Sequence, residues 1–99
     1  MSRPVRYVPV RFVIEGAAVT GPDLAWLALA ALPGLPGHFG RNLDALHDSL
    51  TADLPGPIEI EWRDAAASRA ALGETFDRLR RTLEEAAEAR PDLAVRFRD

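Results

Sequence analysis

The chain has 99 residues, contains no cysteine and carries a formal net charge of −3 at pH 7. This length suits one domain, and a hydrophobic fraction of 47% is enough for a buried core, whereas the absence of cysteine excludes disulfide bonds and thiolate metal sites. The acidic balance argues against direct binding of nucleic acid, for which a basic surface is usual.

The first third of the chain predicts a strand followed by an apolar helix. Apolar residues alternate with other residues over positions 8–14, as they do in a strand with one buried face. A helix is predicted to begin near Pro22, because proline is favoured in the first turn, and the run 24–32 that follows is entirely apolar. We therefore expect this helix to be largely buried, with Trp26 and Leu29 in the core.

The next segment predicts a loop with two glycines and a short amphipathic helix. Asn42 is a good N-cap, because its side-chain oxygen can accept hydrogen bonds from the first turn, and the helix is predicted to begin at about Leu43. Its leucines fall on one face at helical spacing. Beside and opposite them lies a polar stripe, which we call the acidic stripe: Asp44, His47, Asp48 and Thr51.

The second half of the chain predicts a strand, two helices and a last strand. Apolar residues alternate with glutamates over positions 58–63, which indicates a strand. Asp64 is expected to cap a short alanine-rich helix, and Gly73 separates this helix from a longer one that ends before Pro91. The apolar face of the longer helix consists of Phe76, Leu79, Leu83 and Ala86 or Ala87. A last strand is predicted over positions 93–97.

The predicted order of elements is strand, two helices, strand, two helices, strand. Strands that are separated by helical crossovers are expected to lie parallel, with right-handed connections. The expected fold class is α/β, with a small three-stranded parallel sheet packed with about four helices. No repeat or low-complexity linker divides the sequence, so we expect a single domain over residues 1–99.

The acidic stripe has a cost for folding. Asp44 and Asp48 are four residues apart, and like charges at this spacing destabilise a helix by a few tenths of a kcal/mol. Asp44 lies in the first turn, where the helix dipole favours a carboxylate, but Asp48 has no such compensation. The stripe is either a solvated surface or a surface kept for a partner, and the residue pattern leaves both readings open.

Several motifs in and around this helix are shared with a known family. They are Gly40-Arg41-Asn42-Leu43-Asp44-Ala45-Leu46, then Asp48, Leu50, Thr51 and Pro57, and then Glu61-Trp62-Arg63, with further matches at Ile14, Gly16, Asp23, Leu24, Glu85, Ala86 and Asp92. Through these residues the chain resembles the barstar family of intracellular ribonuclease inhibitors. The resemblance covers most of the chain and leaves residues 1–7 as an N-terminal extension.

The resemblance implies a barstar-like inhibitor that occludes the active site of a small, basic, extracellular ribonuclease of the barnase-like, guanyl-preferring kind. The acidic helix and the loop before it would carry the contact, with carboxylates in place of the RNA phosphates. Asp48 would have the central role and Asp44 the second. The implied partner-binding residues are Asp48, Asp44, His47, His38, Gly40, Asn42, Thr51, Glu85 and Phe39.

The chain also departs from the family pattern around this helix. Histidines stand at positions 38 and 47, where the family commonly has an aromatic pair, and Ala52-Asp53 follows Thr51, where the family often continues with Gly-Trp. Phe39 is expected mainly to anchor the loop, and Asn42 mainly to cap the helix. These departures point to a divergent nuclease, or to a binding module of the same fold for another basic partner.

Other functional classes find less support in the sequence. General acid–base catalysis needs a cleft that separates the pKa values of two groups, which an exposed helical stripe does not offer. A metal-dependent hydrolase that uses His38, Asp44 and His47 is a weaker alternative, because the two histidines have no recognised ligand spacing. We therefore expect a protein that is not an enzyme and has no metal or cofactor.

The sequence also suggests where the protein resides. The longest apolar run, 24–32, is much shorter than the roughly 20 residues that a membrane-spanning helix needs. The first residues lack the apolar core and the cleavage site of a signal peptide. We expect a cytoplasmic monomer without membrane contact, which would protect its producing cell from the nuclease before export.

Overall fold

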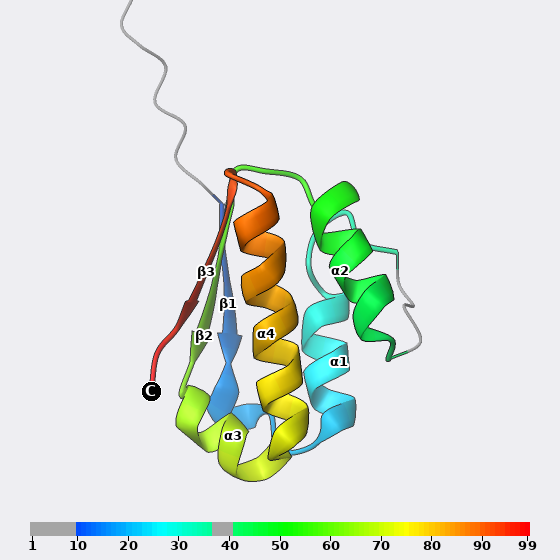
Figure 1. The fold of residues 1–99 in the computed structure, drawn as a ribbon. Helices are drawn as coiled ribbons and strands as arrows, with labels where there is room; N and C mark the ends of the chain where they lie inside the picture. Colours follow the sequence, from blue (N-terminus) through cyan, green and yellow to red (C-terminus); the bar gives the residue numbers. More distant parts are fainter. Residues whose placement is uncertain (1–9, 37–40) are drawn as a thin grey trace, which may run out of the picture.

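The three strands are separated by pairs of α-helices, as predicted, and one additional short 3-10 helix follows the first strand (Figure 1). The computed structural model describes residues 10–36 and 41–99. The strands are β1 (Val10–Glu15), β2 (Ile58–Arg63) and β3 (Leu93–Phe97), and the helices are η1 (Gly16–Ala18), α1 (Pro22–Ala30), α2 (Leu43–Ala52), α3 (Ala65–Leu72) and α4 (Glu74–Ala89). The strands form a parallel sheet in the order β1-β2-β3, which confirms the predicted α/β class. The expected extension, 1–7, and the predicted strand start, 8–9, lie outside the described residues.

The helices α1, α2 and α4 lie on one side of the sheet, and α3 lies at one end of it (Figure 1). Ile58, Ile60 and Trp62 of the central strand are fully buried beneath this helical layer, because alternate side chains of a strand point to the same face. The predicted apolar face of α4 is confirmed. Its buried residues are Phe76, Leu79, Leu83 and Ala86, together with Thr82.

Trp62 is the centre of the core at the end of the sheet nearest α3. Its ring lies 5.6 Å from that of Phe76 in an edge-on arrangement and stacks on Phe97 at 6.1 Å. The indole N–H donates to Ser68 Oγ at 2.9 Å, and Ser68 Oγ in turn donates to the Gly16 carbonyl at 2.8 Å. Because the polar atoms of this buried relay are all paired, it joins β2, α3 and η1 without leaving an unsatisfied group.

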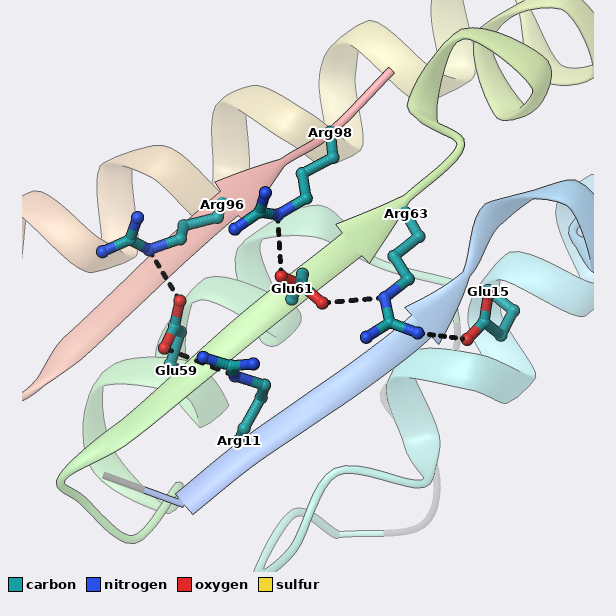
Figure 2. A network of polar contacts seen from close by, with 7 residues as sticks. All are labelled: Arg11, Glu15, Glu59, Glu61, Arg63, Arg96 and Arg98. Atoms are coloured by element: carbon teal, nitrogen blue, oxygen red, sulfur yellow. Dashed lines mark hydrogen bonds and ion pairs between the residues drawn. The ribbon is translucent and has the colours of Figure 1, made fainter. Parts of the chain in front are cut away.

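The other face of the sheet is covered by charged side chains instead of helices (Figure 2). Parallel sheets are usually covered on both faces, so the strands here need a substitute. The ion pairs on this face join Arg11 and Arg96 to Glu59, Arg63 and Arg98 to Glu61, and Arg63 to Glu15. We call these seven residues the charged network.

Glu61 is the most buried member of the charged network. Its carboxylate is only 3% exposed and accepts one hydrogen bond from Arg63 Nε and one from Arg98 Nε, both at 2.8 Å. The hydrogen bond from Arg63 is the main reason that the pKa of Glu61 lies below its ordinary value, although burial acts in the opposite direction. The aliphatic parts of the arginines can shield the sheet while their charged ends stay in water.

The expectation that the apolar helix is largely buried is wrong. In α1 only Ala25 and Leu29 are fully buried, whereas Leu24 is 42% exposed and Leu27 is 65% exposed. Trp26, which we expected in the core, is only partly buried against it. The cause is geometric, because a helix at the surface turns one face to the core and the apolar sequence does not reveal what covers the other. Within the described residues, no helix has both the length and the apolar character needed to cross a membrane.

Asp64 occupies the predicted N-cap position of α3, but its side chain makes no capping hydrogen bond. Its backbone lies in the left-handed region, with φ 50° and ψ 47°, whereas an N-cap residue is normally extended. The backbone conformation therefore turns the chain from β2 into α3, and the predicted capping role of the side chain is wrong.

Candidate functional site

The sequence predicts the start of α2 correctly and its buried face in part, since Leu43 on the predicted inner face is only partly buried. Asn42 Oδ1 accepts a hydrogen bond from the Ala45 N–H at 3.1 Å, which confirms Asn42 as the N-cap. Leu46 and Leu50 are fully buried, and α2 packs against α4. Because these leucines occupy the inner face, the acidic stripe faces away from the core.

Three of the four residues of the acidic stripe, Asp44, His47 and Asp48, form one wall of a groove between α2 and α4. The groove has a volume of about 280 Å³ and is lined by Leu43, Asp44, His47, Asp48, Thr82 and Glu85. Asp44, Asp48 and Glu85 are exposed, and His47 is partly buried. The structure thus brings together four of the residues that the sequence nominates, although Glu85 is far from the others along the chain. We call this site the acidic groove.

In the described part of the chain, the three carboxylates of the acidic groove have no cationic partner. Within residues 10–36 and 41–99, neither Asp44, Asp48 nor Glu85 forms an ion pair. The acids that do form ion pairs are Glu15, Asp23, Glu59, Glu61, Glu74, Asp77, Glu84 and Asp92. The groove therefore presents negative charge that the described part of the chain does not neutralise, and such charge attracts cationic ligands.

Arg90 binds the backbone at the C-terminal end of α2. Its NH1 group donates to the carbonyl oxygens of Leu50 at 2.8 Å and Leu54 at 2.6 Å, and its other nitrogens form a two-pronged ion pair with Asp92. The side chain of Arg90 is only 13% exposed, and its hydrogen bond is the main cause of the lowered pKa of Asp92. This arginine connects the end of α4 to the C-terminal end of α2 and so positions the acidic groove.

An exposed ion pair links the residue before the N-cap of α2 to α1. Arg41, just before the N-cap, has a backbone in the left-handed region, with φ 57°, and its guanidinium pairs with Asp23 in the first turn of α1. Both side chains are largely exposed, so this pair contributes little to stability. It connects Arg41 to the neighbouring helix.

The remaining nominated residues lie outside the acidic groove or outside the described chain. Thr51 Oγ1 donates within α2 to the carbonyl oxygens of His47 at 3.0 Å and Asp48 at 3.1 Å, so its hydroxyl proton is directed to the helix backbone. Asn42 acts as the cap. His38, Phe39 and Gly40 fall outside the described residues, and the structure does not describe the expected loop contacts.

Sequence reasoning missed three contributors to this site. Thr82 and Leu43 line the acidic groove, and Arg90 fixes α2 from across the molecule. Thr82 is one helical turn before Glu85, so the two residues lie on the same face of α4. Once α4 is known to face α2, this spacing predicts that Thr82 also lines the groove. Arg90 gives none, because its acceptors are 40 and 36 residues away in the sequence.

The arrangement is suited to binding through charge. Carboxylates on two neighbouring helices can accept hydrogen bonds from guanidinium or ammonium groups of a partner. Among the described residues, no three histidine, cysteine, aspartate or glutamate side chains are grouped as a metal site requires. His38, the third residue of the metal alternative, lies outside the described residues.

A comparison with family models agrees with this arrangement of helices and sheet. Residues 10–98 match the model of one family, described as Barstar (barnase inhibitor). The matched region contains all three strands, all of α1 to α4 and every residue that lines the acidic groove. The chain therefore belongs to the barstar family of barnase inhibitors.

Proposed function

We propose that this protein inhibits a small, basic, extracellular ribonuclease of the barnase-like, guanyl-preferring kind. The observation that carries the proposal is the acidic groove, in which three carboxylates from α2 and α4 have no cationic partner among the described residues. A ribonuclease holds RNA phosphates with cationic side chains, so carboxylates can occupy the same groups and exclude the substrate. Membership of a family described as barnase inhibitors supports the same assignment.

The roles within the contact follow from position and charge. Asp48, near the middle of α2, is the proposed central contact, and Asp44 and Glu85 are the acids on either side of the acidic groove. His47 offers a flat ring beside them. Asn42 and Thr51 are proposed contacts at the two ends of the helix, and the loop residues His38, Phe39 and Gly40 complete the proposed surface.

The same charges would speed association. A negative groove steers a basic partner during diffusion, so the association rate should fall as added salt screens the charges. An inhibitor of this kind has to act in the cytoplasm of the producing cell, where the nuclease is made before export. No cofactor, metal or nucleic acid takes part in the proposed interaction.

A second candidate is a binding module of the same fold for a different basic protein. It is favoured by the sequence departures around α2, where His47 and the pair Ala52-Asp53 replace residues common in the family. Both functions would use the acidic groove, so the identity of the partner distinguishes them.

The test is RNA cleavage by a guanyl-preferring bacterial ribonuclease from the same organism, titrated with wild-type protein, Asp48→Ala and Glu88→Ala. Glu88 is an exposed acid on α4 outside the acidic groove, so its removal changes the net charge equally. We expect stoichiometric inhibition by wild type and Glu88→Ala and loss of inhibition by Asp48→Ala. Absence of inhibition by every variant would favour the second candidate, and equal losses in both variants would contradict a specific site.

A further inference from the structure

The outer edge of β1 lies beside an exposed apolar groove. Within residues 10–36 and 41–99, β1 pairs with β2 and no strand pairs with its other side. The groove has a volume of about 410 Å³ and lies between β1 and α1, with Phe12, Leu27 and Ala28 among its lining residues. In the described part of the chain, the large apolar side chains that are exposed are Val10, Leu24 and Leu27, all of them on β1 or α1.

At this edge, backbone groups of β1 have no hydrogen-bond partner among the described residues. The Val10 N–H donates to the Pro57 carbonyl, so even-numbered residues of β1 turn their backbone groups toward β2. Arg11 and Val13 therefore turn their N–H and C=O groups outward, because successive residues of a strand alternate in direction. Glu15 turns its N–H outward too, but as the N-cap of η1 it already uses its C=O for the first hydrogen bond of that helix. A strand edge with free groups and nearby apolar surface is a template for another strand.

The sequence of β1 is complementary to itself in one antiparallel register. If Val13 lies opposite Val13 of a second copy, Arg11 of each copy lies opposite Glu15 of the other, and Phe12 lies opposite Ile14. The N–H and C=O groups of Val13 then pair with each other across the two copies, and the Glu15 N–H pairs with the Arg11 C=O. The Arg11 N–H lies opposite the Glu15 C=O, which also accepts from η1. Figure 2 shows Arg11 and Glu15 on the open face of the sheet, towards opposite ends of β1. Both side chains are more than half exposed, so each can accept a second partner beside its own network.

We propose that two copies of this chain associate through β1 in this register, with a two-fold axis at Val13. The cross-strand ion pairs would set the register, and the second copy would cover the apolar groove, including the exposed Leu24 and Leu27 of α1 that line it. The acidic groove shares no lining residue with this surface, so the proposal does not depend on the proposed function. The chain would be a monomer at low concentration and a dimer as its concentration rises.

Sedimentation equilibrium of the full chain over micromolar to millimolar concentration tests the association. Leu27→Glu places a charge in the apolar groove and should raise the dimer dissociation constant at least about tenfold. Ala70→Glu, at an exposed position of α3, introduces the same charge elsewhere and should leave the constant unchanged. A monomer mass at every wild-type concentration, or equal effects of the two variants, would overturn the proposal.

A single-cysteine experiment tests the register, because the chain has no cysteine of its own. Opposite residues in a hydrogen-bonded antiparallel pair have Cα atoms about 5.5 Å apart, which suits a disulfide. Val13→Cys should form covalent dimers several-fold faster on oxidation than Val10→Cys, although Val10 is more exposed and would react faster by random collision. Faster crosslinking at position 10 would overturn the register.

Discussion

The acidic groove and the charged network are two polar surfaces that differ in how their acids are paired. In the charged network, Glu59 and Glu61 each receive two arginines, and Glu61 is nearly inaccessible to solvent. In the acidic groove, three exposed carboxylates have no cationic partner in the described part of the chain. In the charged network, paired charges cover a sheet face that is not covered by helices. In the acidic groove, the carboxylates left unpaired in the described chain are available to the proposed partner. The comparison shows that the role of an acidic surface depends less on its number of acids than on whether each acid is paired with a cation.

The largest expected effect is on binding, through Asp48→Ala. Removal of one partner from a hydrogen-bonded charge pair in an interface costs about 2–5 kcal/mol of binding free energy, so the affinity for the nuclease should fall by that amount. The free energy of unfolding should stay the same or rise by a few tenths of a kcal/mol, since the repulsion from Asp44 is relieved. Calorimetric titration and urea denaturation measure the two quantities. A clear loss of stability would show that Asp48 stabilises the fold, as the acids of the charged network do. It would contradict the distinction between the two surfaces.

The next effect concerns Arg90, which positions the acidic groove without belonging to it. Arg90→Met removes hydrogen bonds to the carbonyl oxygens of Leu50 and Leu54 and should lower the free energy of unfolding by about 1.5–3 kcal/mol. Arg78→Met, which removes an exposed pair with Glu74, should cost about 0.5 kcal/mol or less. Urea denaturation of both variants gives the difference, and equal losses would show that Arg90 does not anchor α2.

The charged network should contribute to stability in a pH-dependent way. The pKa of Glu61 is lower in the folded protein than its ordinary value of 4.5, mainly because of the hydrogen bond from Arg63. The stabilisation is therefore present above pH 4.5 and is lost as the pH falls through the lower folded-state value. Glu61→Gln should be less stable than wild type at neutral pH, with a difference that shrinks in acid. Denaturation curves across this range measure it, and a difference that grows in acid would contradict the assignment.

The smallest expected effect belongs to His47 in the acidic groove. His47 is partly buried in the acidic groove, where its flat ring can stack on a partner. His47→Ala should therefore weaken binding to the nuclease by about 1 kcal/mol or less, whereas His47→Phe, which keeps a flat ring, should weaken it less. Calorimetric titration of both variants measures the difference. Equal affinities of wild type and His47→Ala would exclude the ring from the contact.

Local sequence patterns were most reliable where the structure depends on near neighbours. The N-cap at Asn42, the start of α2 at Leu43 and the buried face of α4 all depend on spacing within a few residues, and all are confirmed. The prediction that α1 is largely buried is wrong. An apolar run shows that a helix can be buried, but it does not show which neighbours would cover the helix. The predicted capping role of the Asp64 side chain is wrong. Aspartate is a residue type that suits an N-cap, but the turn from β2 into α3 imposes a left-handed backbone at this position.

By itself the sequence determined the order of the elements, the parallel α/β class and the presence of an acidic stripe on α2. These follow from periods of two and 3.6 residues and from capping signals, which are local properties of the chain. Only the tertiary structure placed Glu85 opposite Asp44 and Asp48, and only it showed which acids have cationic partners. Arg90 reaches Leu50 across 40 residues, and Arg98 reaches Glu61 across 37. The physical reason is that such pairings depend on how the helices and strands pack, which no local period encodes.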